Sequence, residues 1–468
     1  MSKTFRPADS DALETDLGAA SPGDEIILGK GAYYLDSIRR FKNLRIVGQG
    51  PFETKLLPTK GDGLKSDGGS TFEMFSIVGC DDPLLIINEG NVVRDMMFKD
   101  NGQAVKISGR DNLVERVFFE NSRFNGIDVN GGFAVIPELA RDKPLRLKQE
   151  LGLLIEEKKI YPTQNWTAAQ IKILEQYYYH QNMNIEIRDC VGLNCGNWGG
   201  KDNGAFMKLV PSVGGVRIKN CIGIGNLHDY WFDFPSSAAN FIEENVSIRS
   251  QSVSIYVEGF RHMDTKTHIF GNYTDQAAEA LFVSAYPGAV SWNNIFQFAG
   301  RYGKRIHGIN KKRPRPDFLS KCVTPDGKNP DIIVSQDPDR YKLHLGAHID
   351  ADYDFTKDVL QSTIPLHRGV LVGVSPHLSY DIINRGNAQI VDKYPLPDWV
   401  ANNPWYSEAL KTIGIECPEP DCPDCPDCPD CPDCPDCPDP DPSTGLTKAD
   451  VSEAVLTGLE AFYRRAVP

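Results

Sequence analysis

Four short segments place charged and aromatic side chains in a repeating pattern. They lie 25, 25 and 26 residues apart and are Ala205–Lys208, Tyr230–Asp233, Ile255–Glu258 and Leu281–Ser284. Side chains of a β-strand point alternately to its two faces. If the third residue of each segment points inward, the second and fourth residues form two outward columns. The fourth residues are Lys208, Asp233, Glu258 and Ser284. The second residues are Phe206, Trp231, Tyr256 and Phe282.

The charged column offers acid–base chemistry. Neighbouring strands lie about 4.8 Å apart, so we expect the carboxyls of Asp233 and Glu258 to lie about 5 Å from each other, with Lys208 beside them. Carboxyls separated by about 5 to 5.5 Å act as general acid and nucleophile in retaining glycosidases. Alternatively, Lys208 is the base of a β-elimination, and the carboxylates hold Ca²⁺ against a uronate. A third interpretation is a cross-strand charge network without catalysis.

The aromatic column is a candidate glycan-binding surface, because aromatic rings can stack on sugar rings. Outward aromatic residues also form subunit interfaces, and this alternative stays open. His228 and Asp229 come just before Trp231, and they are interpreted either as residues that line the same groove or as residues of a solvated loop.

The elements that position these columns are predicted to be the rungs of a solenoid. Asn91–Phe98 is echoed 21 residues later by Asn112–Phe119, with the same apolar positions. Further β-branched runs, 25, 27 and 22 residues apart, each end in Asn, at Asn220, Asn245, Asn272 and Asn294. Alternating strands at this spacing, punctuated by Gly and Asn, indicate a stack whose turns each add one strand to several parallel sheets.

The segment Ala12–Tyr33 resembles the first turn of the right-handed parallel β-helix proteins of the pectate-lyase-like superfamily. It combines a short helical pattern, the turn residues Pro22, Gly23 and Asp24, and a first strand. The resemblance covers roughly residues 10 to 300 and implies an all-β, right-handed parallel β-helix over residues 1–300. Because this superfamily includes polysaccharide lyases, epimerases, glycosidases and bacteriophage tailspikes, the resemblance leaves the function open.

One stretch interrupts the rung pattern, from about residue 134 to 182. Leu147, Leu151 and Leu154 recur at helical spacing, and a second apolar set follows Pro162. The pattern predicts two helices inserted in a rung loop. They are interpreted as a lid, a subunit contact or a cover for exposed strand edges.

Residues 301–416 are predicted to form a C-terminal β-rich cap region. A short basic run at Lys304, Arg305 and residues 311–315 stands out in an acidic chain. It is interpreted as a solvated loop or a contact with an acidic partner.

Composition excludes several classes of protein. The 468 residues carry a net charge of −13, which opposes binding to phosphate backbones, so nucleic acid is not an expected partner. Apolar runs stay below the ~18 residues of a membrane helix, so membrane insertion is not expected. The first residues lack the apolar segment of a secretory signal, which predicts synthesis in a cytoplasm.

The most specific sequence feature is a strict Cys-Pro-Asp triplet repeat within residues 417–442. Proline at every third position favours polyproline II, in which neighbouring Cys Cα atoms lie about 9 Å apart, beyond the ~7 Å that a disulfide spans. We therefore expect interchain disulfides between parallel stalks, through Cys417, Cys422, Cys425, Cys428, Cys431, Cys434 and Cys437. A Zn²⁺ or Cu⁺ thiolate cluster and a flexible acidic linker are the alternatives.

Residues 443–468 are predicted to form a docking or trimerisation helix. Val451, Val455, Leu459 and Phe462 make an apolar stripe that a lone helix cannot bury. The helix is expected to bundle with its copies or to bind another protein.

Together these parts predict a bacteriophage virion appendage, such as a tailspike or a tail or neck attachment protein. The expected form is a disulfide-linked homotrimer located in the virion, with the terminal helix bound to other virion proteins. Its role is structural, with binding of host glycan. The alternative is a depolymerase, a lyase or glycoside hydrolase, that cuts bacterial surface polysaccharide. No cofactor is predicted, apart from Ca²⁺ if the protein is a lyase.

Five further cysteines are scattered along the chain: Cys80, Cys190, Cys195, Cys221 and Cys322. Their spacing leaves disulfide pairing and buried free thiols equally open.

Overall fold

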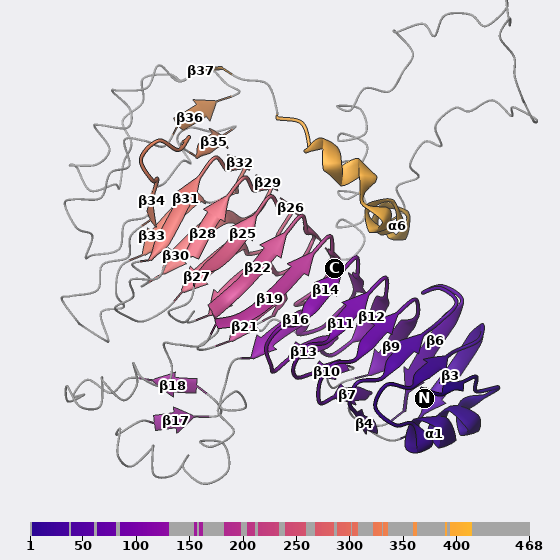
Figure 1. Cartoon of the computed structure of the whole chain (residues 1–468). Helices are drawn as coiled ribbons and strands as arrows, with labels where there is room; N and C mark the ends of the chain where they lie inside the picture. The colour runs from indigo at the N-terminus through magenta and orange to yellow at the C-terminus, as the bar shows by residue number, and fades with distance from the viewer. Residues whose placement is uncertain are drawn as a thin grey trace, which may run out of the picture. The chain divides into compact units, whose positions relative to one another are not determined.

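The computed structural model is a solenoid of parallel β-strands (Figure 1). The structure describes residues 2–36, 39–59, 63–80, 85–130, 154–156, 159–161, 182–197, 204–210, 214–233, 239–258, 267–284, 288–300, 302–307, 322–329, 331–335, 359–362, 389–390 and 394–413. Within these ranges, no helix combines the length and the apolar character needed to cross a membrane.

Each rung contributes strands to three sheets, here called A, B and C. Sheet A contains β1 (Thr4–Phe5), β2 (Glu25–Ile27), β5 (Arg45–Val47), β8 (Thr71–Glu73), β11 (Val92–Arg94), β14 (Leu113–Glu115), β19 (Asn182–Arg188), β22 (Gly214–Lys219), β25 (Asn240–Glu243), β28 (Thr267–Phe270), β31 (Ala289–Trp292) and β34 (Cys322–Val323). Sheet B contains β3 (Gly31–Leu35), β6 (Thr54–Pro58), β9 (Ser76–Cys80), β12 (Met97–Asn101), β15 (Phe118–Glu120), β20 (Val191–Leu193), β23 (Ile222–Ile224), β26 (Val246–Ile248), β29 (Tyr273–Asp275), β32 (Ile295–Gln297), β35 (Ile332–Ser335), β36 (Val359–Ser362) and β37 (Gln389–Ile390). Sheet C contains β4 (Arg39–Phe41), β7 (Leu64–Ser66), β10 (Leu85–Ile87), β13 (Val105–Ile107), β16 (Asn125–Asn130), β21 (Ala205–Val210), β24 (His228–Asp233), β27 (Val253–Glu258), β30 (Glu279–Ser284) and β33 (Tyr302–His307).

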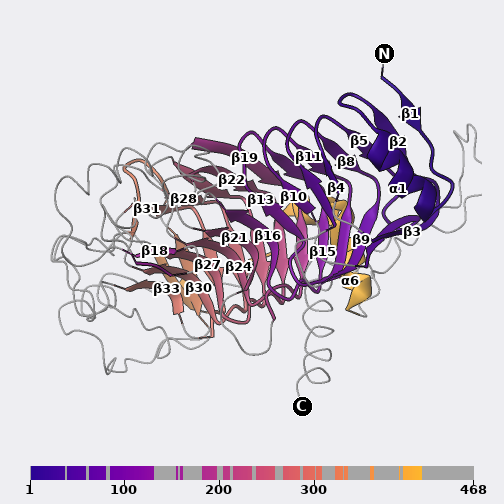
Figure 2. The ribbon, with the colours of Figure 1, turned by 90° about the horizontal axis from the view of Figure 1, so that it is seen from below.

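The parallel β-helix predicted from the sequence is confirmed. Figure 2 shows the strands stacked along one axis, with α1 (Ser10–Ala19) at the N-terminal end of the stack. Asp9 caps this helix by accepting a hydrogen bond from the Ala12 amide at 2.9 Å. The predicted order of helix, Pro-Gly-Asp turn and first strand is therefore present, because β2 begins directly after Asp24.

Tight corners between sheets A and B keep the rungs in register. Most of these corners contain one residue with φ between 50° and 56°, and this residue is Asp95, Arg116, Asp189, Asn220, Glu244 or Asn293. The next residue points into the interior. At three successive corners it is asparagine, and the Asn245 amide donates to Asn272 Oδ1 at 3.0 Å, as the Asn272 amide does to Asn294 Oδ1 at 2.9 Å. This ladder satisfies buried polar groups that would otherwise lack partners.

The expected alignment of Asn220 with this ladder is wrong. Asn220 occupies the bend itself, at φ 50°, and Cys221 takes the inward position, where its amide donates to Asn245 Oδ1 at 2.9 Å. Asparagine tolerates the left-handed conformation, so an Asn at a corner identifies the corner but not which of its two positions it occupies.

The interior is a continuous apolar column. On sheet C, the inward residues Val105, Ile127, Met207, Tyr230, Ile255 and Leu281 succeed one another in the solenoid core. Cys190, Cys195, Cys221 and Cys322 are buried free thiols, so these four do not pair in this structure.

The sheets continue beyond residue 300. β33 pairs with β30, β34 with β31, and β35 to β37 extend sheet B, so strands of the predicted cap region extend the same sheets. Lys304, which the sequence places in a basic run, lies in β33 and is 1% exposed, so the interpretation as a solvated loop is wrong for this residue.

Within the predicted helical insertion, the structure describes only two short strands. β17 (Leu154–Glu156) and β18 (Lys159–Tyr161) pair antiparallel, with Ile155 opposite Ile160. Leu154 therefore lies in a strand and not in the first predicted helix, consistent with the β-branched Ile155 that follows it. The rest of the insertion lies outside the described residues.

A separate C-terminal unit begins at Tyr394. Its described part contains a 3₁₀ helix, Asp398–Asn402, and α6, Pro404–Thr412. Asn403 caps α6, and Trp405, Ala409 and Leu410 are buried. The predicted cysteine stalk and the terminal helix lie outside the described residues.

Candidate functional site

Sheet C brings most of the predicted functional residues together on its outer face. Trp231, Tyr256 and Phe282 are successive Cα partners on β24, β27 and β30. Asp233, Glu258 and Ser284 form the next row, as predicted.

The predicted position of Lys208 in this register is wrong. Lys208 pairs with Trp231, two residues before Asp233, and its other neighbour in the row is Asp128 on β16. A shift of two residues keeps every side chain on the same face, so alternation alone does not distinguish the two registers. Lys208 nevertheless reaches Asp233 diagonally, with Nζ 3.5 Å from Oδ2.

Phe206 does not belong to the outer aromatic column. It is fully buried in the solenoid core, with its ring centroid 5.8 Å from that of Phe119 and 6.2 Å from that of Tyr230. A Cβ on Gly192 would lie 2.3 Å from the Phe206 ring, so the space left by this glycine is what the ring fills. Phe206 is therefore a core residue, and its predicted role in glycan binding is wrong.

The charged cluster is shielded to different extents. Lys208 and Asp233 are 4% and 1% exposed, whereas Glu258 is only half-buried. Asp128, the register partner of Lys208, is also buried. Glu258 is thus the carboxyl of this cluster that an external molecule can reach, with Asp233 and Lys208 behind it.

The surroundings of Glu258 raise its pKa to about 7. Burial is the largest cause, because it disfavours the charged form, and the neighbouring Asp233 carboxylate adds to it. Hydrogen bonding from Tyr256 and the positive charge of Lys208 act in the opposite direction. Asp233 and Glu258 are Cα partners on adjacent strands, so their side chains lie side by side on the outer face of sheet C.

The aromatic residues of the outer face stack on one another. The Trp231 and Tyr256 rings lie 5.1 Å apart at 23°, and the Tyr256 and Phe282 rings 4.8 Å apart at 6°. Lys208 Nζ lies 3.4 Å from the Trp231 ring centroid, and His228 packs at 4.9 Å from Trp231. The faces of Trp231 and Tyr256 are therefore covered by neighbours, so a sugar can contact only the edges of these two rings.

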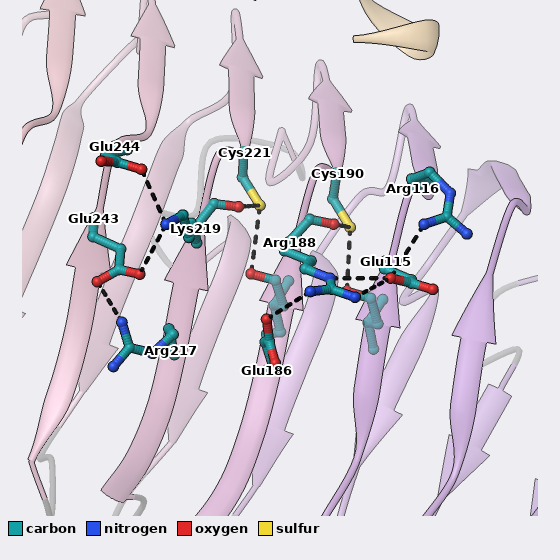
Figure 3. A network of polar contacts seen from close by, with 12 residues as sticks. Glu115, Arg116, Glu186, Arg188, Cys190, Arg217, Lys219, Cys221, Glu243 and Glu244 are labelled. Atoms are coloured by element: carbon teal, nitrogen blue, oxygen red, sulfur yellow. Dashed lines mark hydrogen bonds and ion pairs between the residues drawn. The ribbon is translucent and has the colours of Figure 1, made fainter. Parts of the chain in front are cut away.

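Sheet A shows what a compensated charge ladder looks like in the same solenoid. Figure 3 shows Arg188 between Glu115 and Glu186, and Glu243 between Arg217 and Lys219. Arg188 Nη2 lies 2.6 Å from Glu115 Oε2. In that ladder each carboxylate has a cation beside it. On sheet C, Lys106 and Lys208 are the Cα partners of Asp128 on its two sides, while Lys208 is also the cation that acts on Asp233 and Glu258. Two carboxyls beside one lysine, at Asp233 and Glu258, distinguish this part of sheet C from the sheet A ladder.

The sequence patterns did not predict that two acids, Asp229 and Asp331, are buried. Asp229, a predicted groove residue, lies inside the solenoid, where it accepts hydrogen bonds from Asn226 Nδ2 at 2.7 Å and from Ser247 Oγ. Asp331 pairs with Lys304 at 3.0 Å and also accepts from the Asn294 side chain at 2.7 Å, so it continues the asparagine ladder. Only the spacing to the Asn corners could have indicated Asp331.

Metal ligands do not cluster in the part of the chain that the structure describes: no group of three or more His, Cys, Asp or Glu side chains there is arranged to hold an ion.

No family model matches the chain, and no curated protein matches it. Among solved structures, the chain is similar to a mannuronic-acid-specific family 6 polysaccharide lyase from human gut microbiota, at 11% identity and a TM-score of 0.47, covering 88% of this chain and 95% of that one. It is also similar to an endo-xylogalacturonan hydrolase from Aspergillus tubingensis, at 11% identity and a TM-score of 0.42, covering 74% and 100%. A GH87 α-1,3-glucanase from Streptomyces thermodiastaticus matches at 9% identity and a TM-score of 0.41, covering 76% and 69%. At these identities and scores the similarities do not bear on function.

Proposed function

We propose that the outer face of sheet C hydrolyses glycosidic bonds of a polysaccharide, with Glu258 as the general acid. The proposal depends on one observation: a half-buried carboxyl whose pKa is raised to about 7 lies against a buried carboxylate and a lysine. A general acid works best when its pKa lies near the operating pH, because it is then protonated yet able to transfer its proton.

Asp233 and Lys208 have supporting roles in this proposal. Asp233 raises the pKa of Glu258, so it helps to keep the acid protonated in the free site. Lys208 balances the negative charge of Asp233 and is fixed over the Trp231 ring.

Hydrolysis fits these contacts better than β-elimination. An eliminating base must be free to accept a proton, and the Lys208 ammonium is held by the Asp233 carboxylate and the Trp231 ring. A uronate would add a further negative charge beside Asp128, Asp233 and Glu258.

The test is release of reducing ends from a panel of bacterial capsule, exopolysaccharide and lipopolysaccharide samples. Glu258→Gln is expected to lower the rate at least 100-fold on any polysaccharide that the wild type cuts, because it removes the transferable proton. Glu186→Gln, which removes an exposed carboxylate of sheet A, is the matched control and should retain full activity. Equal activity of Glu258→Gln and wild type would refute the assignment, and an unsaturated product absorbing near 230 nm would indicate elimination instead.

We also propose, from the Cys-Pro-Asp repeat, that the chain forms a disulfide-linked homotrimer of a virion appendage, bound to other virion proteins through its terminal helix and to host glycan through its body. What supports this is the sequence of residues 417–442. On a non-reducing gel, air-exposed protein should run as a trimer that reductant dissociates, and replacement of the repeat cysteines by Ser should abolish that band. A wild type that runs as a monomer would refute it.

A further inference from the structure

The hydroxyl of Tyr256 contacts the reactive carboxyl directly. Tyr256 and Glu258 are two residues apart on β27, so both side chains project from the same face of the strand. Tyr256 Oη donates a hydrogen bond to Glu258 Oε2. Of the two Glu258 oxygens, the one that accepts this bond is oriented by the phenol.

The ring that carries this hydroxyl is held on both faces. Trp231 stacks on one side at 5.1 Å, and Phe282 stacks on the other at 4.8 Å and nearly parallel. His228 adds a third contact, with its ring centroid 5.8 Å from that of Tyr256. The rings come from three adjacent strands whose Cα atoms pair in register, so the backbone ladder fixes the stack. A ring packed in this way has little freedom to tilt, and its hydroxyl has a defined position.

We propose that Tyr256 is a positioning residue for Glu258. The stack of Trp231, Tyr256 and Phe282 holds the Tyr256 ring, and thereby its hydroxyl, in position against the Glu258 carboxyl. This inference rests on the proposed function of Glu258. It also changes the meaning of the aromatic column: the rings serve the carboxyl beside them, and a sugar is not required to stack on their faces.

Several groups change the pKa of the Glu258 carboxyl, and their effects differ in direction. From β24 Asp233 raises the pKa of Glu258, from β21 Lys208 lowers it, and on β27 itself the Tyr256 hydrogen bond lowers it. On β30 the facing residue is Ser284, and His228 of β24 contacts Tyr256. A hydrogen bond donated to a carboxylate stabilises the charged form, so its removal must raise the pKa. Loss of Asp233 would have the opposite effect.

The first experiment follows the titration of Glu258 without any substrate. Protein labelled with ¹³C at glutamate carboxyls is titrated between pH 4 and pH 10 by NMR, and Glu258→Gln identifies the signal. Tyr256→Phe keeps the ring in the stack but removes the hydroxyl. We expect the midpoint to rise by about one pH unit, a tenfold change in the ionisation constant. Tyr34→Phe, at an exposed tyrosine of β3, is the matched control and should leave the midpoint unchanged. An unchanged midpoint in Tyr256→Phe would overturn the inference.

A second variant tests whether the aromatic stack positions the Tyr256 hydroxyl. Phe282→Ala keeps the hydroxyl but removes one ring of the stack, so the midpoint should move in the same direction as in Tyr256→Phe, by a smaller amount. A Phe282→Ala midpoint identical to wild type, beside a shifted Tyr256→Phe, would show that the stack does not position the hydroxyl.

The catalytic part is tested by the pH profile of polysaccharide cleavage. In Tyr256→Phe the alkaline limb, where Glu258 loses its proton, should move upward by the same amount as the NMR midpoint. If the NMR midpoint of Glu258 shifts but the alkaline limb of the pH–activity profile does not, Tyr256 orients Glu258 without contributing to the reaction, and the inference fails. If wild type cleaves nothing and the midpoint shifts, the proposed function fails while the contact between Tyr256 and Glu258 is supported.

Discussion

Substitution of Asp229 by Asn should make the protein more stable at alkaline pH. Asp229 is fully buried inside the solenoid and accepts hydrogen bonds from Asn226 and Ser247. Gly223 provides the room, because a Cβ there would lie 2.0 Å from Asp229 Oδ1. Burial raises the pKa of Asp229 from 3.8 to about 7, and the hydrogen bonds from Ser247 and Asn226 offset only part of that rise.

The magnitude follows from the difference between the two pKa values. A carboxyl with a raised pKa binds its proton more tightly in the folded state than in the unfolded state. Its contribution to stability is therefore complete below about pH 4 and is lost as the pH rises through about 7. The full difference corresponds to about 4 kcal/mol, of which roughly 3 kcal/mol fall between pH 5 and pH 8.

The assay is denaturant unfolding of wild type and Asp229→Asn at pH 5 and pH 8. Asparagine is nearly isosteric and does not ionise; its Oδ1 can still accept from Asn226, and its Nδ2 can donate to the Ser247 hydroxyl. The wild type should lose roughly 3 kcal/mol more than the variant between the two pH values, so the variant should be the more stable protein at pH 8. Glu258→Gln must be measured in parallel, since the pKa of Glu258 is also raised to about 7. A stability difference between wild type and Asp229→Asn that is the same at both pH values would refute the reasoning.

Three further substitutions test the packing of the interior by thermal or denaturant unfolding. Gly192→Ala should destabilise the protein by about 1 to 3 kcal/mol, because the added Cβ would lie 2.3 Å from the Phe206 ring. Combining it with Phe206→Leu should recover part of this loss, and strictly additive effects of the two substitutions would contradict the contact. Lys304→Ala should lower the free energy of unfolding by about 3 to 5 kcal/mol, because it leaves Asp331 buried without its cation. The double variant Lys304→Met with Asp331→Asn should lose much less stability. Equal losses in the two variants would contradict the importance of the ion pair. Asn272→Ala should cost about 3 kcal/mol, because the amide and side chain of Asn245 lose their acceptor, and Ser284→Ala on the outer face should be neutral; a neutral Asn272→Ala would exclude the ladder as a source of stability.

Much of the architecture could be predicted from local patterns. Alternating side chains and corner residues depend on only a few neighbours along the chain. They were enough to predict the spacing of the rungs, the N-terminal helix and turn, and the outward direction of Trp231, Tyr256 and Glu258. Leu154 was misassigned because a short apolar run satisfies both helical and strand patterns.

The two errors at the site have different causes. Lys208 was misplaced because a rung can slip by two residues without changing its alternation, and only packing against the next rung selects the register. Phe206 was placed on the wrong face, which such a slip does not explain. Gly192 on another sheet decides that Phe206 points inward, and this is a contact between residues 14 positions apart that no single-strand pattern contains.

The order of residues along the chain is enough to predict stacked parallel rungs, with acids, a lysine and aromatic rings recurring at rung spacing. Which of these side chains contact one another depends on the folded solenoid, since contacts between rungs join residues more than 20 positions apart. It also decided their chemistry: Glu258 and Asp229 both have a pKa raised to about 7 because burial removes solvation from each carboxyl, and burial is a property of the folded chain and not of residue type.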